Sequence, residues 1–423
     1  MTTDLRIALI GCGVHGGTRL APAVWSTDGV ALSACVDVNP AAARKTAHGV
    51  AEVLTSVEEL TSGGHADAAV IAVPHDDLVP ITQACIEAGL HVLVEKPAGL
   101  NATEVAGVVE AANSRGLTYM PAYCLRFNDV RTRARDLVRR GVVGNIRTLA
   151  AAKGSPPLPG WLADPARGGG QLLFLGSHLV DQLLWLHRQP VVRAYAHITF
   201  RDDTGSDESI SGVIEFADGV SATISLSQAA GVAYDHLEIT GDRGRIRSDW
   251  KSGQIDIESS GAHEFRRPTV EFVQSDPLQP MYDAEMAEFA TAVHLGRPPS
   301  VDGHDAIRTL NVLDALRASA ERGAPVDVDD AVHGSAGRLV DHGPARIRIQ
   351  LTYPSDRIQE PILYELARRF HLKFNVRRAD IDAGIGWVQL MLEGERSEIE
   401  AAIEWVEAQG IRADPVEGDI VSG

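Results

Sequence analysis

The first part of the chain alternates short apolar runs with segments of helical periodicity. The apolar runs are predicted to be buried strands, and they cover residues 6–10, 31–37, 68–73 and 91–95. Strands that alternate with helices are typical of a parallel sheet with helical crossover connections. We therefore predict a doubly wound α/β domain over residues 1–125.

The hydrophobic period changes to two in the middle of the chain, which predicts an open, mostly antiparallel sheet. The expected strands cover residues 192–200, 211–216, 220–227 and 237–239. Helical patterns follow over 281–295 and 304–322, the second closed by Gly323, and a strand over 326–330 ends the unit. Residues 126–330 are therefore expected to form an α+β domain that binds substrate or builds an oligomer.

A third unit follows a segment that is rich in glycine and proline, residues 331–345, which we interpret as a linker. Residues 346–423 then show the order strand, helix, two strands, helix, short strand. This order predicts the βαββαβ arrangement called ferredoxin-like.

Composition narrows the class of protein. A length of 423 residues exceeds one ordinary domain, and a net charge of −18 disfavours partners such as nucleic acids or anionic membranes. No apolar stretch is long enough to span a bilayer. The four cysteines are far apart, so neither a disulfide framework nor a metal site is predicted, and we expect a cytoplasmic protein.

A glycine-rich turn follows the first strand, where a dinucleotide-binding domain requires one. The turn consists of Gly11, Cys12, Gly13, Val14, His15 and Gly16. Asp37 ends the second strand, where a carboxylate can bind the ribose hydroxyls of NAD and repel the 2′-phosphate of NADP. Arg44 leaves NADP as an alternative, and a simple turn followed by a helix-capping acid is the structural alternative.

Lys96 stands in Glu95-Lys96-Pro97, directly after the fourth apolar strand. Parallel sheets bind ligands at the carboxyl ends of their strands, and a desolvated lysine can bind or deprotonate a reacting hydroxyl. The alternative is a surface lysine paired with Glu95. We assign Glu95, Lys96 and Val73, which ends the third strand, to the cofactor site.

The run Gly168–Gly170 leads into one predicted apolar helix that carries His178. At helical spacing Phe174, His178 and Asp181 share one face, and we assign Phe174 and Asp181 to the substrate site. Glycines allow a backbone to approach a ligand closely, and a histidine exchanges a proton near neutral pH. A glycine-rich loop with a structural core histidine is the alternative.

Tyr123 and Arg126 follow the last strand of the first domain and are candidates for contact with the substrate. The next segment carries five further arginines, whose spacing predicts a solvated helix face rather than a binding site. They are Arg131, Arg133, Arg135, Arg139 and Arg140.

These motifs occur together and in one order, and Trp161 precedes the glycine run. In this combination the chain resembles the glucose-fructose oxidoreductase, inositol dehydrogenase and MocA family over roughly residues 4–330. The resemblance implies a Rossmann domain, a sheet domain whose open face often builds oligomers, and hydride transfer to or from sugars, cyclitols and related carbonyl or imine compounds.

The resemblance also assigns roles to residues. It implies that Lys96 orients and polarises the reacting group, that His178 is the acid/base, and that Trp161 lines both the cofactor and the substrate. The family usually has an aspartate four residues before the histidine, where this chain has Phe174. An apolar ring cannot accept a hydrogen bond from a substrate hydroxyl, so a flatter carbonyl or an imine is favoured, with Tyr123 or Tyr234 supplying a proton.

The tail resembles the NIL domain, with Asn375, Val376 and Gly386 fitting its pattern and Arg377 replacing an apolar residue. The resemblance implies an amino-acid effector, and a dimerisation module is the alternative. We expect an NAD-preferring oxidoreductase of a small polar substrate that forms a homodimer or homotetramer. An imine reductase acting on an amino-acid-derived intermediate and a non-catalytic dinucleotide sensor are the alternatives.

Overall fold

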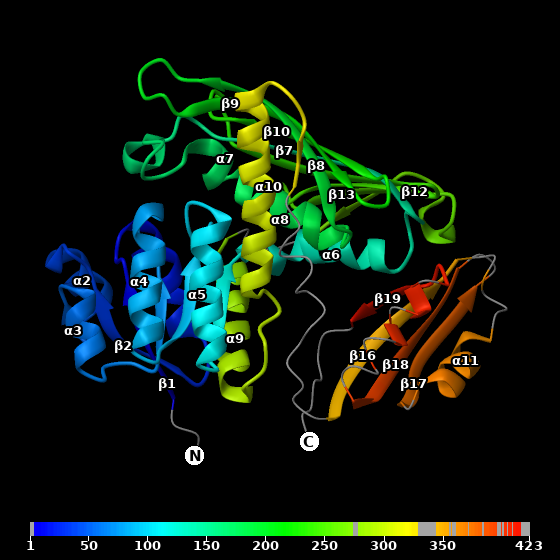
Figure 1. The fold of residues 1–423 in the computed structure, drawn as a ribbon, viewed down its shortest axis with the longest axis horizontal. Helices are drawn as coiled ribbons and strands as arrows, with labels where there is room; N and C mark the ends of the chain where they lie inside the picture. Colours follow the sequence, from blue (N-terminus) through cyan, green and yellow to red (C-terminus); the bar gives the residue numbers. More distant parts are fainter. Residues whose placement is uncertain are drawn as a thin grey trace.

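The computed structural model describes three sheets and the helices around them (Figure 1). The described residues are 4–273, 278–328, 344–354, 357, 361–370, 372–382, 385–395, 399, 402–403, 405–407 and 409–415. Most of the predicted linker, residues 331–343, lies outside them.

The first sheet has six parallel strands in the order β3-β2-β1-β4-β5-β6, which confirms the doubly wound prediction. Its strands are β1 (Leu5–Ile10), β2 (Val30–Val36), β3 (Glu52–Leu54), β4 (Ala68–Ile71), β5 (His91–Glu95) and β6 (Tyr119–Ala122). Its helices are η1 (Gly16–Leu20), α1 (Ala21–Ser26), α2 (Pro40–Ala47), α3 (Val57–Ser62), α4 (His75–Glu87) and α5 (Ala102–Ser114). The strand order reverses between β1 and β4, and such sheets bind ligands at the carboxyl ends of these strands.

The second sheet has nine strands in the order β14-β13-β12-β11-β7-β10-β9-β8-β15. They are β7 (Ile146–Gly154), β8 (Val191–Phe200), β9 (Asp207–Phe216), β10 (Ser221–Ser227), β11 (Tyr234–Gly241), β12 (Gly244–Asp249), β13 (Gln254–Ser259), β14 (Thr269–Phe272) and β15 (Val326–Asp327). Only the β7–β10 pair is parallel among the pairs in this sheet, which confirms a mostly antiparallel sheet.

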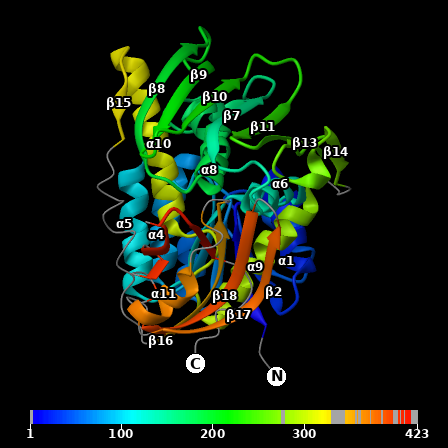
Figure 2. The ribbon, with the colours of Figure 1, turned by 90° about the vertical axis from the view of Figure 1, so that its right-hand side faces the viewer.

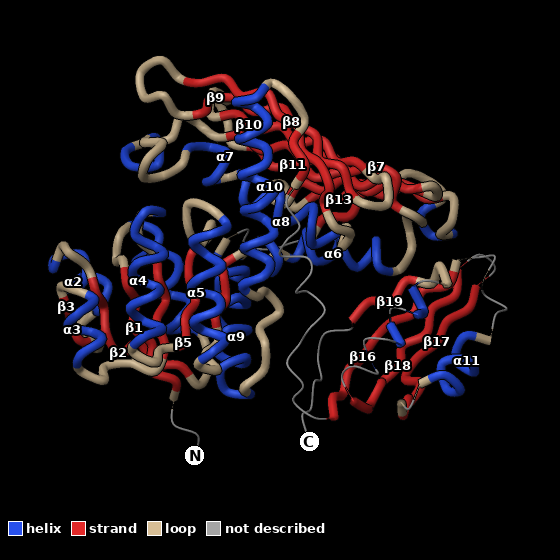
Figure 3. The backbone as a smooth tube through the Cα atoms, viewed as in Figure 1, coloured by secondary structure: helices blue, strands red, loops and turns tan. Residues whose placement is uncertain are grey.

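Helices cover one face of the second sheet (Figure 3). They include η2 (Cys124–Phe127), α6 (Asp129–Arg139), α8 (Gly176–Leu186) and α10 (Gly303–Arg322). The opposite face carries exposed side chains such as Tyr195 and Val213, because alternate residues of a strand point to opposite faces. Helix α10 begins at a capping box of Asp302 and Asp305 and ends at Gly323, whose φ is 64°, as the pattern predicts.

Two helices connect the first two sheets. Helix α10 packs on both α5 and β8, and α9 (Gln279–Leu295) packs on both α1 and η2. One continuous apolar core therefore extends from Leu5 to Val328.

The glycine-rich segment forms two short helices rather than one. Helix α7 (Gly170–Phe174) is separated from α8 at Leu175. The Asp207 carboxylate accepts hydrogen bonds from the backbone N–H groups of Gln171 and Leu172 at 2.5 and 2.6 Å and thereby caps α7. A Cβ on Gly170, whose φ is 74°, would lie 1.8 Å from Oδ1 of Asp207, so only glycine fits there.

The third sheet is antiparallel and has the order β17-β18-β16-β19, as a ferredoxin-like fold requires. Its elements are β16 (Pro344–Tyr353), α11 (Ile362–Arg369), β17 (Lys373–Asp382), β18 (Ile385–Glu395) and β19 (Arg412–Pro415). Figure 1 shows this unit to one side of the first sheet, and in Figure 2 it faces the viewer in front of that sheet. No helix in the described part of the chain is long and apolar enough to cross a membrane.

Candidate active site

The turn after β1 contains three glycines. A side chain on two of them would collide with the backbone, whereas the third has open space around it. A Cβ on Gly11, whose φ is 91°, would lie 2.1 Å from the carbonyl oxygen of Ala72, and one on Gly16 would lie 1.9 Å from that of Gly11. A Cβ on Gly13 would meet no atom within 4 Å. The open space at Gly13 is where a dinucleotide phosphate would approach the backbone, so the turn fits the cofactor.

Asp37 lies beside this turn. Its Oδ2 accepts a hydrogen bond from the backbone N–H of Cys12 at 2.8 Å, and its Oδ1 accepts one from Asn39 at 2.7 Å. Val73 packs beneath the turn, with its Cγ1 3.2 Å from the Cβ position of Gly11, whereas Val14 is exposed. The residues predicted to hold the cofactor therefore lie together at the carboxyl edge of the first sheet.

Lys96 connects the two halves of the site. It follows β5, and its Nζ donates a hydrogen bond to the carbonyl oxygen of Phe174 at 3.1 Å. The same Nζ lies 4.1 Å from the centre of the Phe174 ring, a cation–π contact. The residue that departs from the family pattern therefore contacts the predicted catalytic lysine directly.

The charge of Lys96 depends on its burial. Burial lowers the pKa of Lys96 to about 8, against the opposing effect of Glu95. Burial also acts to raise the pKa of Glu95, but the His15 imidazole at 2.7 Å and Lys96 outweigh it and lower that pKa overall. His15 in turn contacts the ring of Tyr282 edge-on.

His178 is buried near two ammonium groups. Burial, followed by the positive charges of Lys153 and Lys96, lowers the pKa of His178 well below its usual value. Its Nδ1 is buried and has no hydrogen-bond partner within the described structure. The imidazole is therefore neutral at neutral pH, the form that accepts a proton.

Sequence reasoning missed Lys153, which is buried in β7. Its Nζ lies 3.0 Å from Oδ2 of Asp235, and Trp250 donates its indole N–H to the same oxygen at 2.6 Å. Lys153 occupies an inward-facing position in a strand of alternating polar and apolar residues. A charge is too costly to bury without a partner, so this position could have indicated a buried ion pair.

His75 was also missed, although it begins α4 just beyond β4, at the ligand-binding edge of the first sheet. Its Nδ1 lies 2.7 Å from the carbonyl oxygen of Gly168, and its ring contacts Trp161 edge-on at 4.9 Å. Burial lowers the pKa of His75 to about 3, so the neutral ring donates through Nδ1–H. This bond joins the glycine run to the first domain.

Arg126 and Asp181, both predicted to bind substrate, are bound to each other. The Arg126 guanidinium lies 2.6 Å from Asp181 and 3.0 Å from Asp305, and all three side chains are largely buried. Asp181 therefore faces Arg126, whereas Phe174 faces Lys96, across the break at Leu175.

Arg131 corrects the prediction of a solvated arginine face on α6. Its side chain is only 1% exposed and its Nη2 lies 2.5 Å from Oδ1 of Asp235. A second hydrogen bond runs from Nη1 to Oγ of Ser248. The prediction was wrong for this position because the second sheet places a carboxylate and a hydroxyl opposite it, which periodicity cannot show.

The other predicted substrate-binding residues are Trp161, Tyr123 and Tyr234, and each has different neighbours in the structure. Trp161 is half-buried against His75, and Tyr123 is fully buried, with a hydroxyl that has no partner in the described structure. Tyr234 begins β11, where its ring stacks on His236.

A Rossmann sheet joined to a large mixed sheet, with a lysine and a histidine between them, defines a class of nicotinamide-dependent oxidoreductases. Comparison with known families agrees. A family model described as the oxidoreductase family with an NAD-binding Rossmann fold matches residues 5–123, and the GFO/IDH/MocA C-terminal domain matches residues 132–247. The two ranges cover more than half of the chain, which belongs to the Gfo/Idh/MocA family of NAD(P)-dependent oxidoreductases. The NIL domain matches residues 347–415.

Individual relatives share the first two domains. The chain is 28% identical over 331 residues to D-xylose 1-dehydrogenase (NADP(+)) 2 of Haloferax volcanii, covering 77% of this chain and 100% of the relative. It is 25% identical over 325 residues to inositol 2-dehydrogenase of Rhizobium meliloti, covering 75% and 98%. Among solved structures, GenD2 from gentamicin A biosynthesis in complex with NAD has a TM-score of 0.70 and 25% identity, covering 78% and 97%.

Proposed function

We propose that this enzyme transfers a hydride between nicotinamide and a small polar carbonyl or alcohol substrate, of the sugar or cyclitol class, in the cleft between its first two domains. The observation that carries the proposal is the contact of Lys96, from the first domain, with Phe174, from the second. This contact brings the ammonium of Lys96 close enough to His178 to influence the pKa of its ring.

The two side chains have complementary roles in this proposal. A bound nicotinamide supplies the hydride acceptor or donor. In the oxidation direction the neutral imidazole of His178 takes the hydroxyl proton, while the ammonium of Lys96 orients the oxygen and stabilises the negative charge that develops on it. In the reverse direction the imidazolium returns the proton to the same oxygen.

Asp37 supports NAD as the preferred dinucleotide. Its carboxylate is fixed beside the glycine turn, where it would repel a 2′-phosphate. The Haloferax relative is named as NADP-dependent, so both dinucleotides belong in the assay.

Phe174 favours a second candidate reaction, the reduction of an imine derived from an amino acid. The ring covers the Lys96 ammonium with an apolar surface and offers no acceptor for a substrate hydroxyl. A flat imine tolerates such a wall better than a polyol does.

The test measures NADH oxidation and NAD⁺ reduction with a panel of sugars, cyclitols, their keto derivatives and cyclic imines. We expect Lys96→Ala and His178→Ala each to lower kcat/KM by roughly 10²-fold or more, whereas the exposed controls Lys373→Ala and His263→Ala retain activity. Unchanged activity in both site variants would refute the proposal. A protein that never turns over NADH, yet melts higher with both dinucleotide and an amino acid, would be a sensor instead.

The proposal includes three further properties. The exposed face of the second sheet supports a homodimer or homotetramer, and the NIL domain supports an amino-acid effector at the tail. Four buried, free cysteines support a reducing, cytoplasmic location.

A further inference from the structure

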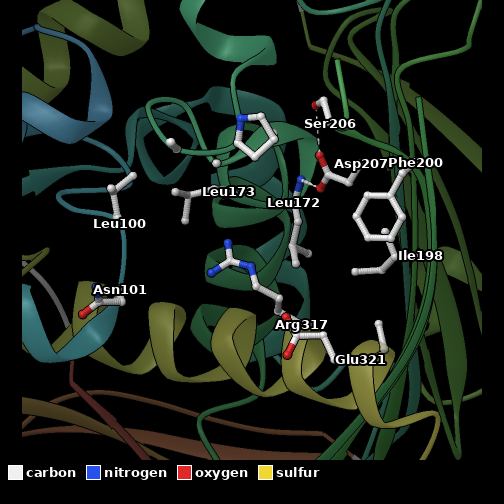
Figure 4. Close-up of a pocket in the computed structure, with 16 residues that line it drawn as sticks. Leu100, Asn101, Leu172, Leu173, Ile198, Phe200, Ser206, Asp207, Arg317 and Glu321 are labelled. Atoms are coloured by element: carbon white, nitrogen blue, oxygen red, sulfur yellow. Dashed lines mark hydrogen bonds between the residues drawn. The ribbon is translucent and has the colours of Figure 1, made fainter. Parts of the chain in front are cut away.

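A cavity of about 490 Å³ lies beside α7 (Figure 4). Its walls come from the loop after β5, the glycine run before α7, the ends of β8 and β9, and the last turns of α10. Neither Lys96, His178 nor Phe174 lines it. It is therefore a site separate from the proposed catalytic cleft, and nothing in the proposed reaction uses it.

Apolar side chains form part of the cavity wall. Leu173 of α7 faces Ile198 and Phe200 of β8 across the cavity (Figure 4). Phe200 is 60% exposed. An exposed aromatic side chain at the mouth of a concave apolar surface is typical of a ligand-binding site.

Two opposite charges stand four residues apart on the α10 wall. Figure 4 shows the Arg317 guanidinium reaching into the cavity, with Glu321 one turn further along the helix. Arg317 makes a distant ion pair, 3.7 Å from Asp314, and its charge also acts on the Asp207 carboxylate, which lines the same cavity. Its guanidinium therefore retains donors that can reach a ligand.

Asn101 adds a donor on the opposite wall. Its Oδ1 accepts a hydrogen bond from the backbone N–H of Glu104 at 3.0 Å and caps α5. Since the oxygen is used in the cap, the amide –NH₂ is the group available to a ligand. Asp207, by contrast, is committed to α7 through its two backbone hydrogen bonds.

This charge pattern selects among ligands. A plain carboxylate would meet Arg317 but be repelled by Glu321, and a plain amine would meet Glu321 but be repelled by Arg317. A molecule that carries a carboxylate and an ammonium on one carbon can pair with Arg317 and Glu321 at the same time, and an apolar group on that carbon can pack against the apolar wall.

We propose that the cavity binds a free α-amino acid with an apolar side chain. Its carboxylate pairs with Arg317 and Asn101, its ammonium pairs with Glu321, and its side chain packs between Leu173 and Phe200. This site is distinct from any effector site in the NIL domain, and it does not depend on the proposed reaction because neither Lys96, His178 nor Phe174 lines it.

The test is isothermal titration of the full chain, with and without NADH, using L-leucine and L-phenylalanine. 4-Methylpentanoate and isopentylamine, which each lack one charge of leucine, serve as probes. We expect the amino acids to bind in both conditions, and the two probes to bind at least about tenfold more weakly, because each leaves a charged wall unpaired.

Variants locate the binding. Arg317→Gln and Phe200→Ser are each expected to weaken amino-acid binding at least about tenfold, and the second is at an exposed position that tolerates substitution. Arg322→Gln, on the same helix outside the cavity, and Asn375→Ala, in the tail, are expected to leave binding unchanged. Equal binding of the single-charge probes, no binding at all, or loss of binding in Asn375→Ala with retention in Arg317→Gln would each overturn the proposal.

Discussion

The Phe174 ring and carbonyl together set the environment of the Lys96 ammonium. The carbonyl accepts a hydrogen bond and the ring offers its face, but neither carries a full negative charge. Burial therefore dominates and holds the pKa of Lys96 at about 8 rather than at the 10.5 of a free lysine. The lysine is charged below pH 8 and becomes neutral as the pH rises through 8.

This pKa predicts the pH dependence of turnover. If Lys96 must be charged, kcat/KM falls as the pH rises through about 8. Phe174→Asp places a carboxylate within reach of the ammonium, which favours the charged form and moves this decline upward by roughly 1 to 3 pH units. The measurement is the pH profile of NADH-dependent reduction.

Phe174→Leu is the matched control because it removes the ring without adding a charge. We expect its decline to stay near pH 8 or to move slightly lower, since the cation–π contact stabilises the ammonium. A profile that is the same in Phe174→Asp as in the wild type would show that Lys96 does not govern the decline.

At the level of elements, Arg126 joins three helices that come from distant parts of the chain. It lies in η2, Asp181 lies in α8 and Asp305 lies in the first turn of α10. The pKa of Asp305 is lowered despite burial, because the positive charges of Arg126 and Arg308 outweigh the loss of solvent. Asp181 depends on Arg126 for compensation of its charge, whereas Asp305 also pairs with Arg308.

Replacement of Arg126 by methionine should therefore destabilise the fold. Removal of one partner from a buried ion pair costs roughly 3–5 kcal/mol, because the remaining charge stays buried. Urea unfolding should show this loss in Arg126→Met and not in Arg115→Met, whose exposed arginine lies at the end of α5. A variant that unfolds like the wild type but has a raised KM would instead assign Arg126 to the substrate.

At the scale of the whole molecule, the chain has two separate apolar cores among its described residues. One extends from Leu5 to Val328 and the other from Ile349 to Ala413. The described polar contacts between the tail and α6 include hydrogen bonds from Arg412 to the carbonyl oxygens of Arg139 and Val138 at 2.6 and 3.1 Å. These carbonyls lie at the end of α6, and that of Val138 also accepts a hydrogen bond from the backbone N–H of Gly141 at 2.9 Å.

A chain that ends after Val328 should therefore fold and bind dinucleotide. Loss of a few hydrogen bonds at one helix end removes about 1 kcal/mol, which shifts the melting temperature of the large core by roughly 2–4 °C. Scanning calorimetry with and without NAD measures both properties. Aggregation of the shortened chain, or loss of its response to NAD, would show that the tail is part of the main fold.

Much of the fold could be predicted from local pattern. The strand 91–95 was predicted at its exact bounds, because a short apolar run buried on both faces has clear ends. The short strand β3 was not named and the glycine-rich segment was predicted as one helix. Asp207, which is 36 residues from Gln171 in the sequence, caps α7 and so determines where that helix begins.

The sequence by itself determined the Rossmann turn and the departure at Phe174 and singled out Lys96 and His178 as candidate site residues, because each of these rests on local spacing or on one motif. Only the tertiary structure decided what these residues touch. It placed Phe174 on Lys96, bound Arg126 to Asp181, buried Arg131 and brought His75 to Gly168. These contacts join segments far apart in the sequence, and their charges and pKa values depend on burial, which no local pattern records.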